Sequence, residues 1–331
     1  MAIAILIIIF FIILFLYLSD FYFIPTEIKK FTVERKENLT QETTLPSGEI
    51  RGFQPYQYQI KNITLNITHP LLHPNIRWAK MPILVKIDNL TCNPSMMSKI
   101  RYSMQLWQSE TDNVVSFKEV GNDYQLFINC TTEVESKREG EYIITKLGEG
   151  GPTKIFPTDY FNLTLEAIAK IFATTKDCVK PIRILHELGH VLGLDHVNDS
   201  KSIMYPYEDC QQDFTLEIKQ TIKELYKTKA LPDLYFLNTT ATTFGPYLNV
   251  SFTVRNGGIL ASPSVKVEIK GDGSLITNYT IEPLQPTEIF IVKLGNIYVG
   301  KRFNKISLLL DPENNVEEFD EENNQLVLKY E

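Results

Sequence analysis

The chain has 331 residues, of which 44% are hydrophobic and 22% are charged. These shares are those of globular proteins and exclude a disordered or fibrous chain, and the length favours two domains that each bury a core. Thirty-three Lys and Arg stand against 40 Asp and Glu, so the formal net charge is -7. A nucleic-acid binder needs a basic face to displace counterions from phosphate, and we therefore expect no nucleic-acid partner.

An apolar segment opens the chain. Residues 2–18 carry no charged side chain, and a shorter apolar stretch follows at 21–24. A helix needs about 20 apolar residues to cross the hydrocarbon core of a membrane, so this segment is long enough. No pair of small residues stands at the spacing of a signal-peptide cleavage site. We expect residues 1–24 to form an uncleaved transmembrane anchor, with a cleaved signal and a secreted protein as the alternative.

Two features of the sequence disagree about the side of the membrane. Basic residues follow the apolar segment and none precedes it, which by the positive-inside rule favours a cytoplasmic chain. Ten Asn-x-Ser/Thr sequons, where chance predicts about three, and an even set of four cysteines instead favour an exported glycoprotein with disulfides. We expect a single-pass protein of the cell membrane whose bulk is extracellular. The sequons begin at Asn38, Asn62, Asn66, Asn89, Asn129, Asn162, Asn198, Asn238, Asn249 and Asn278.

Residues 25–75 show no sustained helical period and are expected to form a stalk or linker, with strand-like stretches at 56–60 and 63–67. Residues 76–230 then mix strand and helix patterns, which indicates an α+β domain. Strands are expected at 82–87, 114–120, 124–130, 142–146 and around Ile155, and helices at 94–108, 165–173, 181–192 and 216–226. The glycine-rich stretch at 148–152 lacks the strand–loop–helix context of a phosphate-binding loop, and we interpret it as a turn.

From residue 231 onward the apolar residues alternate with a period of two, and no helical pattern remains. Short strands separated by Gly, Pro, Asn and Asp turns are typical of an Ig-like β-sandwich. We place the domain boundary at 230–233, so that residues 231–331 form the second domain. Its strands are expected at 234–237, 247–255, 265–270, 276–281, 288–294, 305–310 and 325–330.

One segment matches the pattern H-E-x-x-H-x-x-G-x-x-H at every fixed position. His186 and His190 are four residues apart, so a helix directs both imidazoles to one face, where they can share a metal. Gly193 permits a left-handed turn that ends the helix and returns the chain, so that His196 can supply a third ligand. Three neutral nitrogens leave one tetrahedral position open, as in catalytic zinc sites, and Glu187 stands beside them as the general base.

This segment resembles the motif of the metzincin zinc endopeptidases, whose second mark is a methionine-containing turn after the third histidine. Here Met204 stands in Ser-Ile-Met-Tyr-Pro, and its spacing is similar to that of the matrixin branch. The resemblance covers about residues 76–229 and implies a mixed twisted sheet with three main helices, one catalytic Zn²⁺ and a protein or peptide substrate. It implies that Met204 forms an apolar floor beneath the histidines. Zinc would activate a water, and Glu187 would pass its proton to the leaving amine.

The resemblance also implies that Pro206 and Tyr207 help to wall the pocket for the substrate residue just after the scissile bond. Some metzincins place a tyrosine ligand two residues after the methionine, and here that position is Pro206. No stretch resembles the matrixin cysteine switch, so we expect no latency through a Cys–zinc bond. The structural zinc and calcium loops of vertebrate matrixins are not recognisable. Bound Ca²⁺ is a candidate that the sequence does not support.

The four cysteines contain no C-x-x-C pair, which argues against a cysteine zinc site or a redox pair. Four cysteines permit three disulfide connectivities. Cys178 and Cys210 bracket the histidines and the methionine turn, whereas Cys92 and Cys130 fall at the expected start of a helix and end of a strand. We therefore favour the pairs Cys92–Cys130 and Cys178–Cys210.

The C-terminal domain resembles CARDB, a cell-adhesion-related module of bacteria and archaea, through Val-Arg-Asn-Gly-Gly at 254–258 and the acidic ending at 311–324. Such a sandwich presents loops for contact with proteins, and a surface layer or a glycan is a candidate partner. Two functions remain open. The chain is a membrane-anchored extracellular zinc endopeptidase, or it is a surface adhesin whose protease domain is inactive or secondary. The intact Glu187 favours the first.

Overall fold

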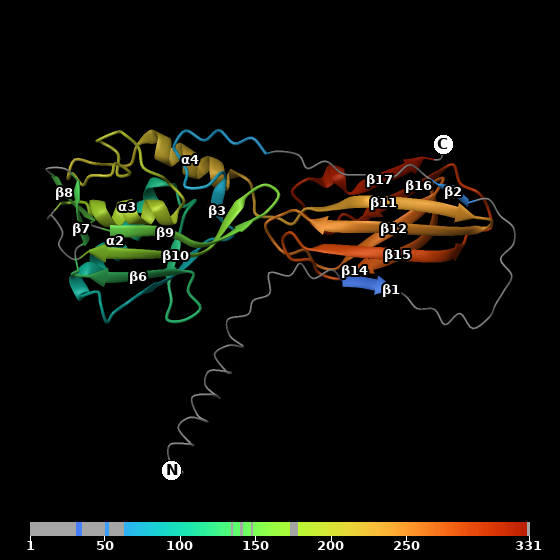
Figure 1. The fold of residues 1–331 in the computed structure, drawn as a ribbon, viewed down its shortest axis with the longest axis horizontal. Helices are drawn as coiled ribbons and strands as arrows, with labels where there is room; N and C mark the ends of the chain where they lie inside the picture. The colour runs from blue at the N-terminus through green and yellow to red at the C-terminus, as the bar shows by residue number, and fades with distance from the viewer. Residues whose placement is uncertain are drawn as a thin grey trace, which may run out of the picture.

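The computed structural model describes residues 31–34, 50–52, 63–133, 135–139, 142–146, 148–172 and 178–329. Two units lie end to end along the long axis of the molecule, the first coloured mainly green and the second orange to red (Figure 1). The expected anchor at 1–24 and the strand-like stretch at 56–60 lie outside the described residues. Among the helices that are described, none is both long enough and apolar enough to cross a membrane.

The first unit is built on a six-stranded sheet in the order β3-β10-β6-β4-β5, with β9 paired to β10. The strands in this order pair in parallel, whereas β9 runs antiparallel to β10. A separate two-stranded hairpin consists of β7 and β8. The strands are β3 (Ile76–Trp78), β4 (Ile83–Ile87), β5 (Phe117–Glu119), β6 (Leu126–Thr131), β7 (Glu135–Glu139), β8 (Tyr142–Lys146), β9 (Gly148–Pro157) and β10 (Asn162–Phe172).

Three helices complete this unit: α2 (Pro94–Glu110), α3 (Ile182–Val191) and α4 (Leu216–Lys227). Helix α2 begins after Asn93, whose side chain accepts a hydrogen bond from the backbone N–H of Met96. Helix α3 contacts α2, β9 and β10, and α4 contacts β3. All three helices form where the sequence predicts them, because each has apolar residues recurring along one face.

Two expectations for this unit are wrong. The residues expected to form a helix at 165–173 belong to strand β10, and the glycine-rich stretch expected to form a turn begins strand β9. Leu, Glu, Ala and Lys are good helix formers, which explains the first error. In the fold, however, β10 pairs with β6, β3 and β9, and its alternate residues Ala167, Ala169 and Ile171 are buried. Burial between neighbouring strands overrides local propensity here.

The second unit is the expected all-β sandwich. One sheet has the order β14-β13-β16-β17, and the other contains β15-β12-β11 at its centre. Pairs among these strands are antiparallel, and alternate residues face a common apolar core. The strands are β11 (Leu234–Phe244), β12 (Tyr247–Asn256), β13 (Val265–Gly271), β14 (Ser274–Ile281), β15 (Ile289–Tyr298), β16 (Lys305–Leu310) and β17 (Gln325–Lys329).

The segment expected to form a stalk contacts both units. Strand β1 (Phe31–Glu34) pairs in parallel with β15, and strand β2 (Ile50–Gly52) pairs antiparallel with β11, so both lie at the edges of the second sandwich sheet. Residues 63–67 form no strand. Further along, Leu71 forms an isolated antiparallel bridge with Leu194 of the first unit.

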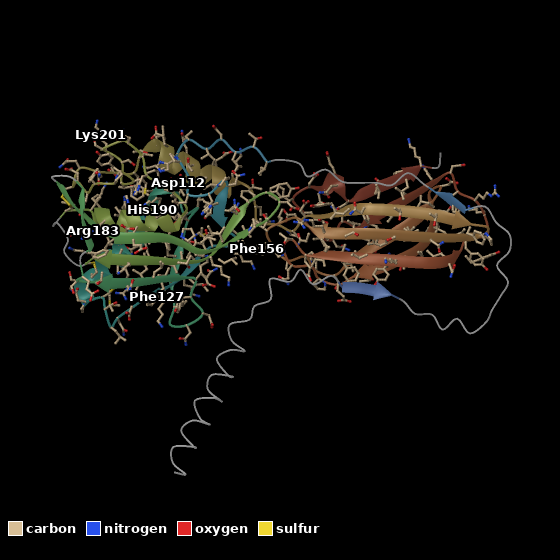
Figure 2. The ribbon with its side chains drawn as sticks, viewed as in Figure 1. Asp112, Phe127, Phe156, Arg183, His190 and Lys201 are labelled. Carbon is tan, nitrogen blue, oxygen red and sulfur yellow. A yellow bond between two sulfur atoms is a disulfide. The ribbon has the colours of Figure 1, made fainter. Side chains whose placement is uncertain are left out.

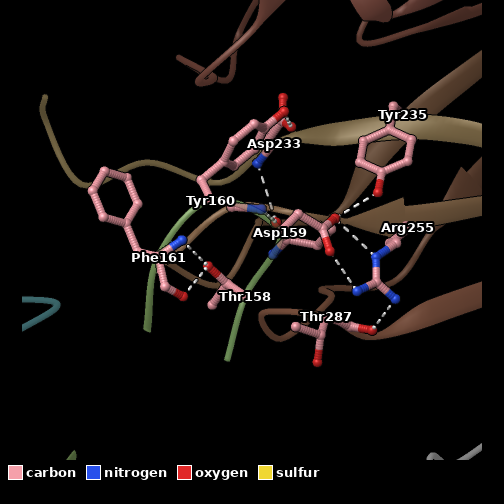
Figure 3. Close-up of polar contacts among 10 residues, drawn as sticks. Thr158, Asp159, Tyr160, Phe161, Asp233, Tyr235, Arg255 and Thr287 are labelled. Carbon is pink, nitrogen blue, oxygen red and sulfur yellow. Dashed lines mark hydrogen bonds and ion pairs between the residues drawn. The ribbon is translucent and has the colours of Figure 1, made fainter. Parts of the chain in front are cut away.

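The turn between β9 and β10 joins the two units. Figure 3 shows Asp159 of this turn facing Arg255 and Tyr235 of the sandwich. The Nη2 and Nε atoms of Arg255 donate to the two carboxylate oxygens of Asp159 at 2.7 and 3.0 Å, and the Tyr235 hydroxyl donates to the same carboxylate at 2.5 Å. Because the Asp159 side chain is only 5% exposed, this ion pair is largely shielded from solvent.

Aromatic packing extends the junction. The Tyr160 hydroxyl donates to Asp233 at 2.8 Å, and its ring stacks on Phe319 with the centroids 4.6 Å apart. Close to this stack, the buried Glu318 carboxylate accepts hydrogen bonds from the backbone of Leu234 and the side chain of Asn324. Burial raises the pKa of Glu318 to about 8. Burial also raises the pKa of Asp233.

Candidate metal centre

Helix α3 carries the first two histidines of the motif, and two tryptophans fix its position. The Trp107 indole donates to the carbonyl of Leu185 at 3.1 Å, and the Trp78 indole donates to the carbonyl of Val191 at 3.0 Å. The second bond satisfies a carbonyl in the last turn of the helix, which has no partner within the helix. Both indoles therefore hold α3 against the core.

Gly193 ends this helical region and returns the chain toward the histidines. Its φ of 93° lies in the left-handed region that favours glycine. A Cβ atom here would also lie 2.4 Å from a side-chain carbon of Ile76. Conformation and space therefore both require glycine at this position, as the sequence motif predicts.

The three histidines converge on one point. The Nε2 atoms of His186, His190 and His196 lie 3.0, 3.1 and 3.2 Å from one another. A tetrahedral zinc ion with Zn–N bonds of about 2.0–2.1 Å places its ligand nitrogens about 3.3 Å apart. Within the described part of the chain, these histidines form the group that can hold a metal ion, and no acidic cluster meets that criterion. Figure 2 shows His190 on α3, inside the first unit.

The protons on two of the histidines are placed away from this point. The Nδ1 atom of His186 lies 2.7 Å from the carbonyl of Ile203, and that of His190 lies 2.8 Å from the carbonyl of Leu194. A carbonyl only accepts, so each Nδ1 carries the proton and each Nε2 keeps its lone pair. These lone pairs point toward one position and repel one another there. A cation bound at that position would be coordinated by them.

Electrostatics also favour the neutral imidazoles that a metal needs. Burial, reinforced by the neighbouring His190, lowers the pKa of His186 to about 3. Burial lowers the pKa of His190 as well. Three neutral imidazole nitrogens in this arrangement fit a borderline-soft divalent ion such as zinc.

Glu187 follows the first histidine on α3 and is only 5% exposed. Strand β9 passes close to it through two glycines. A Cβ atom on Gly148 would lie 2.0 Å from the Glu187 Oε1 atom, and one on Gly150 would lie 2.4 Å from the Glu187 carbonyl oxygen. Gly148 therefore leaves the space that the Glu187 carboxylate occupies, and Gly150 leaves the space for the Glu187 backbone.

The methionine turn lies against the same helix. Met204 is fully buried, and a Cβ atom on Gly189 of α3 would lie 2.3 Å from its sulfur. The backbone N–H of Val197 donates to the Met204 carbonyl at 3.1 Å, so the turn also holds the segment that follows His196. Met204 therefore contacts α3 at the residue immediately before His190.

Two disulfides are present, and they are the pairs favoured from the sequence: Cys92–Cys130 and Cys178–Cys210. The first links the start of α2 to the end of β6. The second joins the chain before α3 to the loop that follows Met204. The described chain contains no free cysteine.

The loop after Met204 contains the two residues expected to line the substrate pocket. Pro206 is exposed and the Tyr207 side chain is 61% exposed, so both are accessible to a ligand. The Tyr207 carbonyl accepts a hydrogen bond from Gln212 at 2.7 Å. Nearby, Arg183 of α3 forms an ion pair with Glu208 at 2.6 Å in which both side chains are buried. Figure 2 shows Arg183 on the same helix as His190.

Sequence reasoning did not find two groups that support this site. His69, which lies in the segment at 25–75 expected to form a stalk, is buried and contacts the carbonyl of Asp195. The Arg183–Glu208 pair was also missed. Both contacts join residues far apart in sequence, so no local spacing pointed to them.

Comparisons with known proteins match the second unit and the C-terminal part of the first. Residues 231–327 match the CARDB family model, and residues 176–227 match the Matrixin family model. The Matrixin match spans α3 and α4 and includes the three histidines, Glu187 and Met204. None of the curated proteins matches the chain. The C-terminal unit is a CARDB domain.

Solved structures similar to the chain include the CARDB domain of a Pyrococcus furiosus protein in complex with di-metal ions, with 25% identity, coverage of 31% of this chain and 96% of that chain, and a TM-score of 0.26. A solution structure of the same CARDB domain has 24% identity, coverage of 30% and 92%, and a TM-score of 0.25. A domain from Methanosarcina acetivorans, named as part of a cell surface protein, has 22% identity, coverage of 30% and 90%, and a TM-score of 0.23.

Proposed function

We propose that the chain is a zinc-dependent endopeptidase that acts outside the cell. The observation that carries this proposal is the convergence of three histidine Nε2 atoms within 3.2 Å of one another, with Glu187 next to the first histidine on the same helix. The match of this region to the Matrixin family supports it.

A zinc ion bound here would supply Lewis-acid chemistry that polarises the scissile carbonyl and lowers the pKa of the attacking water. His186, His190 and His196 would hold the ion and leave one position open for substrate and water. Glu187 accepts a proton from the water and donates it to the leaving amine. Its burial keeps this proton transfer away from bulk solvent.

Met204, Pro206 and Tyr207 have supporting roles in this proposal. Met204 packs beneath α3 and keeps the helix, and with it two of the ligands, in place. Pro206 and Tyr207 are exposed on the loop that follows and would wall the pocket for the substrate residue just after the scissile bond. We propose no role for Ca²⁺.

An extracellular location, with residues 1–24 as the membrane anchor, fits three observations. Both disulfides need an oxidising compartment. The CARDB domain is similar to a domain from a protein named as a cell surface protein. Several sequon asparagines are also exposed, as a glycan requires: Asn66, Asn89, Asn198, Asn238 and Asn278.

The decisive experiment compares the parent with Glu187→Gln. We expect both to bind one zinc ion per chain, and the variant to lose at least about 100-fold in hydrolysis of casein or of a peptide library, because the general base is gone. Glu217→Gln changes an exposed carboxylate on α4 and serves as the control. A Glu187→Gln variant that cleaves as fast as the parent contradicts the mechanism.

The alternative is a surface adhesin in which the protease domain is inactive or secondary, and the CARDB domain favours it. The two functions predict different behaviour of the parent chain once it has bound zinc. A parent that binds zinc in one-to-one ratio yet cleaves no peptide in a diverse library supports the adhesin. Cleavage that stops on adding a chelator and returns with zinc supports the endopeptidase.

A further inference from the structure

A short segment before β3 lies along the loop that delivers the third histidine. The backbone N–H of Leu72 donates to the Gly193 carbonyl at 2.9 Å, and the N–H of Asp195 donates to the Pro70 carbonyl at 3.0 Å. Leu71 and Leu194 form the antiparallel bridge between these two hydrogen bonds. The two segments therefore form a miniature ribbon that ends one residue before His196.

His69 closes this ribbon. Its Nε2 atom lies 2.9 Å from the Asp195 carbonyl, and because a carbonyl only accepts, Nε2 carries the proton and donates. The side chain is 2% exposed. Its own backbone N–H donates to the Thr221 hydroxyl of α4 at 2.9 Å, so this helix fixes the backbone from which the imidazole extends.

His196, the third ligand, differs from the other two in the contacts that fix the direction of its ring. His186 and His190 each donate from Nδ1 to a backbone carbonyl, which fixes the direction of the ring. Among the described residues, no acceptor faces the Nδ1 atom of His196, and its side chain is exposed. The position of this ligand therefore depends on the backbone on either side of it.

That backbone is held at two points. Val197, after the ligand, donates to the Met204 carbonyl. Asp195, before the ligand, is bound through its N–H by Pro70 and through its carbonyl by the His69 imidazole. Removing the His69 bond leaves the part-buried Asp195 carbonyl without this donor. The peptide unit that precedes His196 then keeps the bond of its N–H to the adjacent Asp195 carboxylate, which does not tie it to the segment at 68–72, so it can rotate.

We infer that His69 is a positioning residue for the metal centre: its Nε2–H bond to the Asp195 carbonyl sets the peptide that aims His196 at the ion. The inference rests on the three-histidine zinc site of the proposed function, but not on peptide hydrolysis. It places the segment at 68–72 in the same unit as the proposed zinc site. It also assigns a role to His69, one of the two histidines outside the motif.

The test measures zinc affinity directly, by competition of Zn²⁺ with a chromophoric chelator on the full chain. His69→Gln places an amide N–H where the imidazole Nε2 stands, whereas the shorter His69→Asn falls short of the Asp195 carbonyl. We expect His69→Asn to bind Zn²⁺ about 10- to 100-fold more weakly than the parent, as for other losses of support behind a metal ligand. We expect His69→Gln to stay within about threefold of the parent, because it restores the donor.

Two controls separate positioning from folding and from loss of a histidine as such. His73→Asn makes the same change at an exposed histidine four residues further along, and it should leave zinc affinity unchanged. His69→Leu fills the space without a donor, and its thermal midpoint in excess chelator reports on the metal-free fold. Parent-like affinity in His69→Asn and His69→Leu, or equally weak binding in His69→Gln and His69→Asn, overturns the inference. A parent that binds zinc but cleaves nothing contradicts only the proposed function.

Discussion

Arg255 of the sandwich binds both carboxylate oxygens of Asp159, which lies at the tip of the β9–β10 hairpin of the first unit. This is the bidentate geometry in which guanidinium–carboxylate pairs are strongest. The Asp159 side chain is 5% exposed and that of Arg255 is 25% exposed, so water screens the pair only in part. Together with the stack of Tyr160 on Phe319, the pair fixes one domain against the other.

We expect Asp159→Asn to weaken this coupling by about 2–3 kcal/mol, because the Arg255 charge loses its partner in a half-buried place. In differential scanning calorimetry, the parent should unfold in one transition and the variant in two, one for each domain. Glu166→Gln removes an exposed ion pair between Glu166 of β10 and Lys154 of β9, and this variant should keep a single transition. Identical calorimetric profiles for the parent and Asp159→Asn speak against the coupling.

A methyl group at Gly148 tests the placement of the general base. An added Cβ atom would lie 2.0 Å from the Glu187 Oε1 atom, so the carboxylate must move. We expect Gly148→Ala to lower kcat/KM by about 10- to 100-fold, since a displacement of about 1 Å has this effect on positioned groups. Zinc stoichiometry should stay at that of the parent.

The matched control is Gly121→Ala, where an added Cβ meets no atom within 4 Å. Gly121→Ala should retain parent kinetics and stability. Retention of full activity by Gly148→Ala would show that the carboxylate can work from a displaced position. Loss of bound zinc from Gly148→Ala would instead show that β9 supports the ligands rather than the base.

The raised pKa of Glu318 predicts that the free energy of unfolding depends on pH. Burial raises its folded-state pKa to about 8 from the usual 4.5, so the folded chain binds this proton more tightly than the unfolded chain. Its stabilising contribution is full below about pH 4.5 and is lost as the pH rises toward about 8, up to about 5 kcal/mol at 1.36 kcal/mol per unit. Asp233, whose pKa is also raised, acts in the same direction.

We expect Glu318→Gln to remove most of this loss, because an amide stays neutral at every pH and its oxygen still accepts from the Leu234 N–H. Urea unfolding at about pH 5, 7 and 9 should show the variant gaining on the parent as the pH rises. Glu317→Gln, which alters the exposed neighbour paired with Lys229, should follow the parent. Equal pH profiles for the parent and Glu318→Gln would mean that Glu318 is ionised in the folded chain.

The convergence of the three histidines was predictable because their spacing is local. Four residues separate His186 from His190, which is one turn of helix, and Gly193 marks the end of that helix. The sandwich strands were predictable for a similar reason, since alternation with a period of two extends over each of them. Strand β10 was not, because good helix formers fill it and only its pairing with β9 and β6 makes it a strand.

Local sequence patterns could not predict the contacts that support the site. The sequence separates His69 from Asp195 by 126 positions and Arg183 from Glu208 by 25, so no helical or strand period relates them. The Asp159–Arg255 pair spans 96 positions and depends on how two domains meet. These contacts follow from the tertiary fold, which a single sequence does not reveal by its spacing.

The Cys178–Cys210 disulfide closes a covalent ring of chain that contains the three-histidine site. All three histidines, Glu187 and Met204 lie inside this ring, between its two sulfur atoms in the chain. A peptidase at high local concentration exposes its own loops to its neighbours. A single cut within the ring leaves both fragments joined through the sulfurs, so the ligands stay tethered to one another. Under the proposed endopeptidase function, the bridge would let the three-histidine site outlast one cut made by a second copy of the chain.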